Sequence, residues 1–270
     1  MNMRVNNIKP ILEVIAVDAA DAQAAEQGGA DRIELVSAMS EGGLTPSYGQ
    51  IEQVVSKVSI PVYVMIRPHS RSFCYSAEDL QAMLQDIRVA RELGAAGIVI
   101  GALTHEGEVH RSFLQTCLFE ALRLGVTFHR AIDSSAYVAS ALESIGDMNG
   151  RIEGRDDSGS GSKSRSKSEG EYAREIAVVE RVLTSGGKPT APEGLLELKQ
   201  LQEMGQTLNI SIMAGSGVTI GGISTIVSRT AITEIHMGSG VRRGGSFDHP
   251  VDAGLVAQAK AELIRAVQEL

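Results

Sequence analysis

The chain has no tryptophan, and aromatic residues make up only 4% of its 270 residues. A core must therefore consist mainly of Ala, Val, Ile and Leu, and the 43% of hydrophobic residues suffice for one. Only two cysteines, Cys74 and Cys117, are present, and their separation predicts no disulfide, so we expect a reduced, cytoplasmic setting. No apolar run reaches the roughly 18 residues of a membrane span, and residues 1–10 lack the apolar stretch of a signal peptide.

An excess of basic residues is also absent. The chain carries 25 Lys and Arg against 33 Asp and Glu, a net charge of -8. Since negative charge repels nucleic-acid phosphates and anionic lipids, we predict neither a nucleic-acid nor a membrane partner. A small ligand is the expected partner.

Eight short apolar runs, each followed by a helical pattern, dominate the chain. The runs cover residues 11–16, 31–36, 61–67, 97–101, 125–130, 180–185, 209–214 and 233–237. Alternating strands and helices predict parallel pairing with right-handed crossovers, and eight such units predict a TIM (β/α)8 barrel. A doubly wound open sheet is the alternative, but no glycine-rich dinucleotide turn follows the first run. We expect a single domain over residues 1–270.

Residues 147–174 interrupt this pattern with a low-complexity insertion rich in Ser, Gly and charge. Such a segment has little to bury, so we predict that it is disordered. It lies between the fifth predicted helix and the sixth predicted strand, which is the N-terminal face of a barrel. A tolerated surface insertion and a phosphorylated Ser/Arg tract are both open interpretations.

Charged side chains alternate with apolar ones in several of the predicted strands. Arg32 and Glu34, for example, share one face opposite Ile33. Helices cover the outside of a barrel, so the charged face should point into the lumen, where both signs allow pairing. The inward set comprises Glu13, Arg32, Glu34, Arg67, His129, Glu234 and His236.

Catalytic residues of this fold come from the C-terminal ends of several strands. Glu34 and His129 are therefore candidate acid/base groups, and Arg67 or Arg130 would hold an anionic group. Asp133 could orient His129 or bind the ligand directly. The alternative is a charged network that only fills a polar lumen.

Two glycine-rich segments follow the last two predicted strands, at residues 214–219 and 238–245. Backbone amides there, including those of Gly215 and Gly217, would suit an anion, although ordinary tight turns are the alternative. Thr184, at the end of the sixth run, completes the predicted ligand-binding set.

Several motifs in this order resemble the CutC family, named for copper homeostasis. They lie at residues 30–35, 41–47, 65–68, 73–76, 127–130, 181–186 and 213–215. The resemblance implies a cytoplasmic TIM barrel, a homodimer or homotetramer, and Cu(I) binding. Ile15 and Val36 stand where family members commonly carry cysteine, which leaves Cys74 as the predicted copper ligand. The competing hypothesis is an enzyme acting on a small anionic or phosphorylated metabolite at the barrel mouth.

Overall fold

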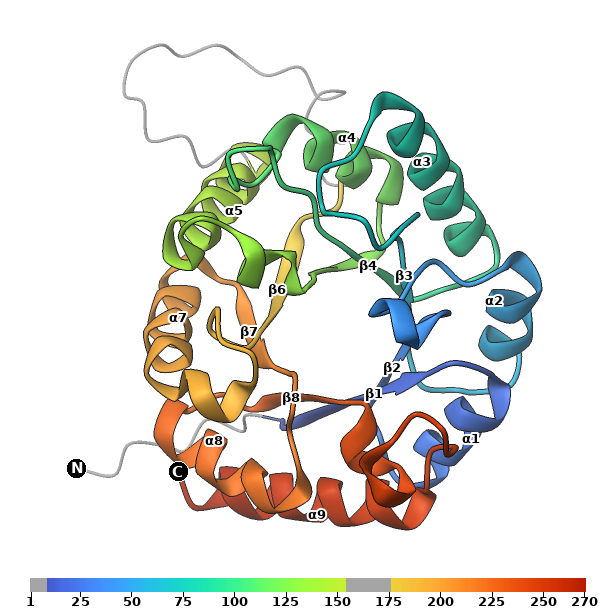
Figure 1. Cartoon of the computed structure of the whole chain (residues 1–270), viewed down its shortest axis with the longest axis vertical. Coiled ribbons are helices and arrows are strands. Elements are labelled where there is room, and N and C mark those ends of the chain that lie inside the picture. Colours follow the sequence, from blue (N-terminus) through green and yellow to red (C-terminus); the bar gives the residue numbers. More distant parts are fainter. Residues whose placement is uncertain (1–8, 154–175) are drawn as a thin grey trace.

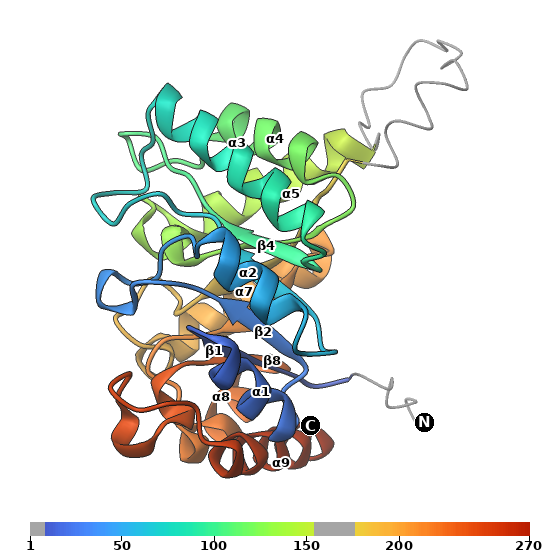
Figure 2. The same ribbon diagram turned by 90° about the vertical axis from the view of Figure 1, so that its right-hand side faces the viewer.

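The computed structural model describes residues 9–153 and 176–270, and these residues form the predicted TIM barrel. Eight parallel strands close in sequence order, with β1 hydrogen-bonded to both β2 and β8. The strands are β1 (Ile11–Ala16), β2 (Arg32–Leu35), β3 (Val62–Met65), β4 (Gly97–Ile100), β5 (Gly125–Phe128), β6 (Val179–Thr184), β7 (Ser211–Ala214) and β8 (Glu234–Met237). Figure 1 looks down this ring, and Figure 2 shows the helices lying alongside the strands.

Helices surround the strands as an outer layer (Figure 1). They are α1 (Ala19–Gln27), α2 (Tyr48–Val55), α3 (Ala77–Glu92), α4 (Arg111–Ala121), α5 (Val138–Glu153), α7 (Leu195–Leu208), α8 (Ile223–Thr230) and α9 (Ala253–Gln268). Several begin at the side-chain caps that the sequence offers. Asp18 accepts a hydrogen bond from the amide of Asp21, and Ser76 forms a capping box with Asp79.

Short 3-10 turns follow several strands and shape the C-terminal mouth. They are η1 (Met39–Glu41), η2 (Arg130–Ser134), η3 (Ala191–Gly194), η4 (Ile220–Gly222), η5 (Ser239–Val241) and η6 (Arg243–Gly245). Among the described residues, no helix combines the length and the apolar character needed to cross a membrane.

The buried apolar side chains form two clusters that the strands separate. The large cluster contains outward-facing strand residues such as Ile33 and Phe128, which pack against the helices. The small cluster lies within the barrel and consists of Ile15, Val36, Tyr63, Met65 and Val99. The predicted charged set shares the lumen with this small cluster, so the apolar outer face is confirmed, whereas the inner face is mixed rather than wholly charged.

The predicted start of the insertion at residue 147 is wrong, because α5 continues to Glu153. Met148 and Ile152 extend the buried face of Ile145 at helical spacing, and all three are buried. Asn149 binds the backbone of Val179 through both atoms of its side-chain amide, at 2.8 and 3.0 Å. Residues 154–174 of the predicted insertion lie outside the described residues.

Candidate functional site

A cavity of about 720 Å³ opens at the C-terminal mouth of the barrel. Seven of the predicted site residues line it, and they come from four strand ends and two loops. They are Glu34, Arg67, His129, Arg130, Asp133, Gly217 and His236. Ser216 and Ser239, from the two predicted glycine-rich segments after β7 and β8, also line the cavity, whereas sequence reasoning missed Lys188, which follows β6.

Five other predicted binding residues do not line this cavity. Glu13, Arg32 and Glu234 form a charged layer below its floor, and Thr184 is fully buried. Gly215 packs so closely that a Cβ atom there would lie 2.5 Å from Leu183 Cδ1 and 3.3 Å from His236 Cβ. These residues support the cavity wall and floor rather than face a ligand.

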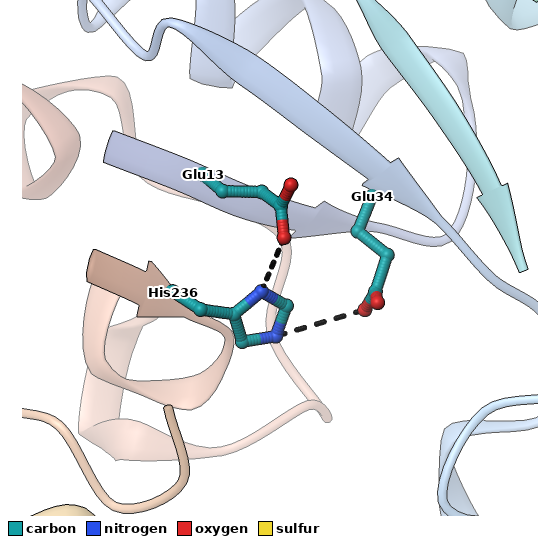
Figure 3. A group of neighbouring side chains, drawn as sticks. All are labelled: Glu13, Glu34 and His236. Carbon is teal, nitrogen blue, oxygen red and sulfur yellow. Dashed lines mark hydrogen bonds and ion pairs between the residues drawn. The ribbon is translucent and has the colours of Figure 1, made fainter. Parts of the chain in front are cut away.

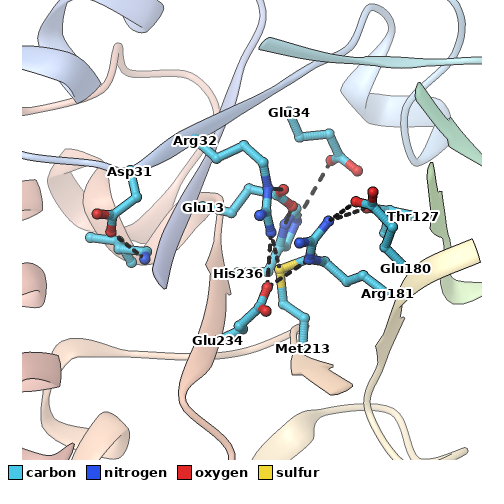
Figure 4. Close-up of polar contacts among 11 residues, drawn as sticks. Glu13, Asp31, Arg32, Glu34, Thr127, Glu180, Arg181, Met213, Glu234 and His236 are labelled. Atoms are coloured by element: carbon cyan, nitrogen blue, oxygen red, sulfur yellow. Dashed lines mark hydrogen bonds and ion pairs between the residues drawn. The ribbon is translucent and has the colours of Figure 1, made fainter. Parts of the chain in front are cut away.

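The charged layer pairs both signs across four strands (Figure 4). Arg32 binds Glu13 through Nε, and its Nη2 lies 3.2 Å from Glu234 Oε2. Arg181 donates from Nε to the same Glu234 oxygen at 2.6 Å. Both guanidinium groups stack on the Tyr63 ring, at 5.1 and 5.6 Å from its centroid.

Sequence reasoning missed Arg181 and Tyr63. Tyr63 shares the inward face of Met65 and Arg67 by strict alternation, so its position was available from the sequence. Arg181 shares its strand face with the apolar Leu183, and this mixture of charged and apolar residues on one face hid its inward direction.

Above this layer, three side chains form a chain of polar contacts (Figure 3). His236 Nδ1 lies 2.7 Å from Glu13 Oε1, and His236 Nε2 lies 3.6 Å from Glu34 Oε2. Glu34 Oε1 is buried and has no hydrogen-bond partner among the described residues. Glu34 therefore ends this series of contacts at the cavity, with one buried oxygen that has no partner in the described part of the chain.

The surroundings shift the pKa values of these three side chains in different directions. Burial raises the pKa of Glu34 to about 7, and the neighbouring Glu13 carboxylate acts in the same direction. Burial also opposes charge on Glu13, but Arg32 and His236 outweigh it and hold the pKa of Glu13 well below its ordinary range. Burial opposes charge on His236 as well, but Glu34 and Glu13 outweigh it and raise the pKa of His236. Glu34 is thus a carboxyl group that can exchange a proton near neutral pH.

His129 lies at the end of β5 and is 3% exposed. Its Nδ1 accepts a hydrogen bond from the amide of Ala131 at 3.1 Å, whereas Nε2 is buried without a partner among the described residues. Burial, and then the positive charge of Arg67, lower the pKa of His129 to about 3. The imidazole is therefore neutral at physiological pH.

One prediction was that Asp133 orients His129, but the two side chains are not in contact. Its carboxylate accepts from Arg130 Nε at 2.9 Å, from Thr184 Oγ1 at 2.5 Å and from the amides of Ser185 and Gly187. Asp133 thus fixes the loop after β6 and holds Arg130 at the rim of the cavity.

Arg67 is less available to an anion than the sequence suggested. Its Nη1 donates to the carbonyl oxygens of Glu41, Gly42 and Gly43 at 3.2 to 3.3 Å, and its guanidinium lies 4.8 Å from the Phe73 ring centroid. Arg67 therefore holds the loop after β2 in place, and only Nε is left buried and unpaired.

The structure offers one group of three metal-type ligands among residues 9–153 and 176–270. Glu13, Glu34 and His236 have one ligand atom each within 4.8 Å of the others. The predicted ligand Cys74 is outside this group, and its thiol donates to the carbonyl of Thr104 at 3.2 Å.

Comparisons with known proteins identify the family. The CutC family model matches residues 10–152 and 171–241. A family protein CutC from Vibrio campbellii is 39% identical over 78% of this chain and 74% of its own length. The corresponding protein from Pasteurella multocida is 38% identical over 86% and 83%.

Solved structures agree with this. CutC from Streptococcus agalactiae, a structure named for copper homeostasis, superposes with a TM-score of 0.68 at 27% identity, covering 85% of this chain and 98% of that one. Phosphoribosyl anthranilate isomerase from Thermotoga maritima has a TM-score of 0.57 over 97% of this chain, but at 10% identity it shares only the fold. With a family model over most of its length and relatives near 40% identity, this chain belongs to the CutC family.

Proposed function

We propose that this protein is an enzyme that transfers a proton on a small anionic metabolite at the mouth of the barrel. The observation that carries the proposal is Glu34, a buried carboxyl at the cavity with one unpaired oxygen. Its pKa of about 7 suits a group that both accepts and releases a proton at neutral pH. The contacts through His236 to Glu13 hold it in position.

The anionic character of the ligand is supported by the rim of the cavity. The side chains of Arg130 and Lys188 are 40% and 44% exposed, and both residues line the cavity. The backbone of Ser216, Gly217 and Ser239 lies on the same rim, where barrels often hold phosphate. An anionic tail at the rim would leave the reacting part of the ligand near Glu34.

A copper-related ligand is the second candidate, and the family name together with the group of Glu13, Glu34 and His236 favours it. These donors do not fit Cu(I), which prefers thiolate and thioether sulfur to carboxylate. Glu13 is already paired with Arg32, and the Met213 sulfur accepts from Arg32 at 3.3 Å. These residues therefore do not form a Cu(I) site.

Turnover of metabolites tests the proposal. Wild-type protein and Glu34→Gln would be incubated with a mixture of small phosphorylated and carboxylated metabolites in ordinary water and followed by NMR. We expect the wild type to convert at least one compound and Glu34→Gln to be slower by about 10²- to 10⁴-fold. Glu180→Gln, an exposed glutamate outside the cavity lining, is the matched control. Equal rates for Glu34→Gln and wild type, or no conversion at all, would contradict the proposal.

A titration with Cu(I) against a competing chelator tests the second candidate. From the donor set, we expect no sub-micromolar site in the wild type. A tight site that disappears in Cys74→Ala, or one that disappears in Glu13→Gln, would restore the copper hypothesis.

A cytoplasmic homodimer or homotetramer is also part of the proposal. Tyr137 and Leu196 are 77% and 68% exposed. Tyr137 directly precedes α5 and Leu196 lies in α7, and these two helices are neighbours. Apolar side chains of this size support a self-association surface. Light scattering after size exclusion would test it, and a monomeric mass would refute it.

A further inference from the structure

The tautomer of His129 is fixed by the backbone. The amide of Ala131 donates to Nδ1, so Nδ1 carries a lone pair and not a proton. Burial, together with the charge of Arg67, keeps the ring neutral, since it holds the pKa of His129 near 3. A neutral imidazole with an unprotonated Nδ1 has its one proton on Nε2.

Nε2 is consequently a hydrogen-bond donor without an acceptor. Its side chain lines the cavity, and no described residue accepts from it. An unmade hydrogen bond from a buried donor costs stability, which favours a role in binding. Gly101 leaves room for the His129 ring, because a Cβ atom at this position would lie 2.5 Å from Nδ1.

Glu34 and His129 reach the same cavity from β2 and β5, three strands apart around the ring. One offers a proton acceptor and the other a neutral proton donor. Hydroxyl groups that could act as nucleophiles lie at the rim, on Ser134, Ser216 and Ser239. The deep part of the cavity therefore suits proton transfer rather than acyl transfer.

We infer that the ligand is a small anionic carbonyl compound from which Glu34 removes a proton α to the carbonyl, while His129 Nε2–H donates to the carbonyl oxygen. This inference rests on the proposed function and names its substrate class. The pair of electrons from the C–H bond forms a C=C bond, and the carbonyl π pair moves to oxygen. Glu34 holds the proton and returns it to the same carbon. Where the α-carbon bears a hydroxyl, Glu34 can instead return the proton to the former carbonyl carbon while the hydroxyl proton passes to the former carbonyl oxygen, so the atoms balance without a further reactant.

A neutral donor suits this step. The developing oxyanion receives a hydrogen bond that is in place before the reaction, in a site remote from bulk water. Because Nε2 is buried, the carbonyl oxygen reaches it only when a covering side chain moves aside. Phe73 lines the cavity beside this imidazole, and its ring centroid lies 5.1 Å from that of His129.

The tautomer can be measured without any ligand. Nitrogen NMR of the full chain labelled with ¹⁵N-histidine should find one of the six histidines neutral, with its proton on Nε2, throughout pH 5 to 8. Loss of that signal in His129→Gln assigns it. A proton on Nδ1, or an imidazolium in this range, would overturn the inference even if the protein turns over a metabolite.

The reaction is tested by deuterium incorporation. Wild-type protein in D₂O would be given a panel of phosphorylated ketones and aldehydes, with dihydroxyacetone phosphate as the first probe. We expect exchange of an α-proton, reduced about 10²- to 10³-fold in His129→Leu and less in His129→Gln, which retains an N–H donor.

Four outcomes decide between the proposals. Exchange that depends on both Glu34 and His129 supports the inference. Turnover that depends on Glu34 but incorporates no deuterium at carbon overturns the inference and leaves the proposed function standing. Exchange that is unchanged in His129→Leu also overturns the inference, and absence of both turnover and exchange overturns both proposals.

Discussion

The buried neutral His129 should make the protein less stable as the pH falls, and His129→Gln should remove this effect. Its pKa is about 3 in the folded chain, against an ordinary value of 6.5, because burial and Arg67 oppose its charge. The unfolded chain therefore binds a proton below pH 6.5 that the folded chain refuses until about pH 3. Stability from this group is complete above pH 6.5 and is lost as the pH falls towards 3.

The magnitude follows from the two pKa values. A pH of 5 lies about 1.5 units below the ordinary pKa of histidine, so proton binding stabilises the unfolded chain by about 2 kcal/mol at this pH. At pH 7 this loss of stability is close to zero, because the unfolded chain is then mostly unprotonated at this histidine. Gln can still accept from the amide of Ala131, so its own cost should be nearly the same at both pH values. The difference in unfolding free energy between wild type and variant should thus shrink by about 2 kcal/mol from pH 7 to pH 5.

Urea unfolding followed by circular dichroism at pH 5, 6 and 7 measures this difference. Comparing the variant with the wild type cancels the carboxyl groups, which are common to both. His249→Gln is the matched control, since that side chain is exposed in the folded chain as in the unfolded one. A constant difference between wild type and His129→Gln at all three pH values would refute the reasoning, because it would mean that His129 protonates freely in the folded state.

Other predictions concern packing and thiol chemistry. Glu13→Gln removes one of the two carboxylates that pair with the buried Arg32 guanidinium and also the carboxylate beside His236, so it should lower the unfolding free energy by about 3–5 kcal/mol in urea; a loss below about 1 kcal/mol would contradict the buried pair. Gly101→Ala should cost about 1–3 kcal/mol because its Cβ would meet the imidazole, whereas Gly49→Ala, with open space in α2, should stabilise by about 0.5–1 kcal/mol; equal effects would contradict this packing. Ellman's reagent should titrate one thiol in the native state, since Cys74 is partly exposed while Cys117 is buried with its pKa raised to about 12, and two native thiols would disprove this.

Much of the fold was predictable because it depends on periodicity. The alternation of Arg32, Ile33 and Glu34 places charge on one strand face, and helices outside a barrel leave only the lumen for that face. The boundary at residue 147 was wrong because composition hid a helical pattern. Met148 and Ile152 continue the buried face of α5 within a stretch that is mostly polar.

The candidate site was less predictable, because alternation gives a direction but no depth. Glu13 and Glu34 both face inward, yet Glu13 pairs with Arg32 below the floor while Glu34 reaches the cavity. Partner choice was equally hidden. Asp133 lies four residues from His129 in sequence, but its carboxylate binds the loop after β6.

By itself, the sequence determined the barrel, the inward direction of the charged residues and the resemblance to the CutC family, since each follows from local spacing or from ordered motifs. Only the tertiary structure decided which charges pair and which group stays free. Pairing depends on distances between strands far apart in the chain, such as the 2.7 Å between His236 and Glu13. Those distances leave Glu34 Oε1 and His129 Nε2, in residues that line the cavity, without a partner among the described residues, and in our proposal these two groups take the acid/base and donor roles.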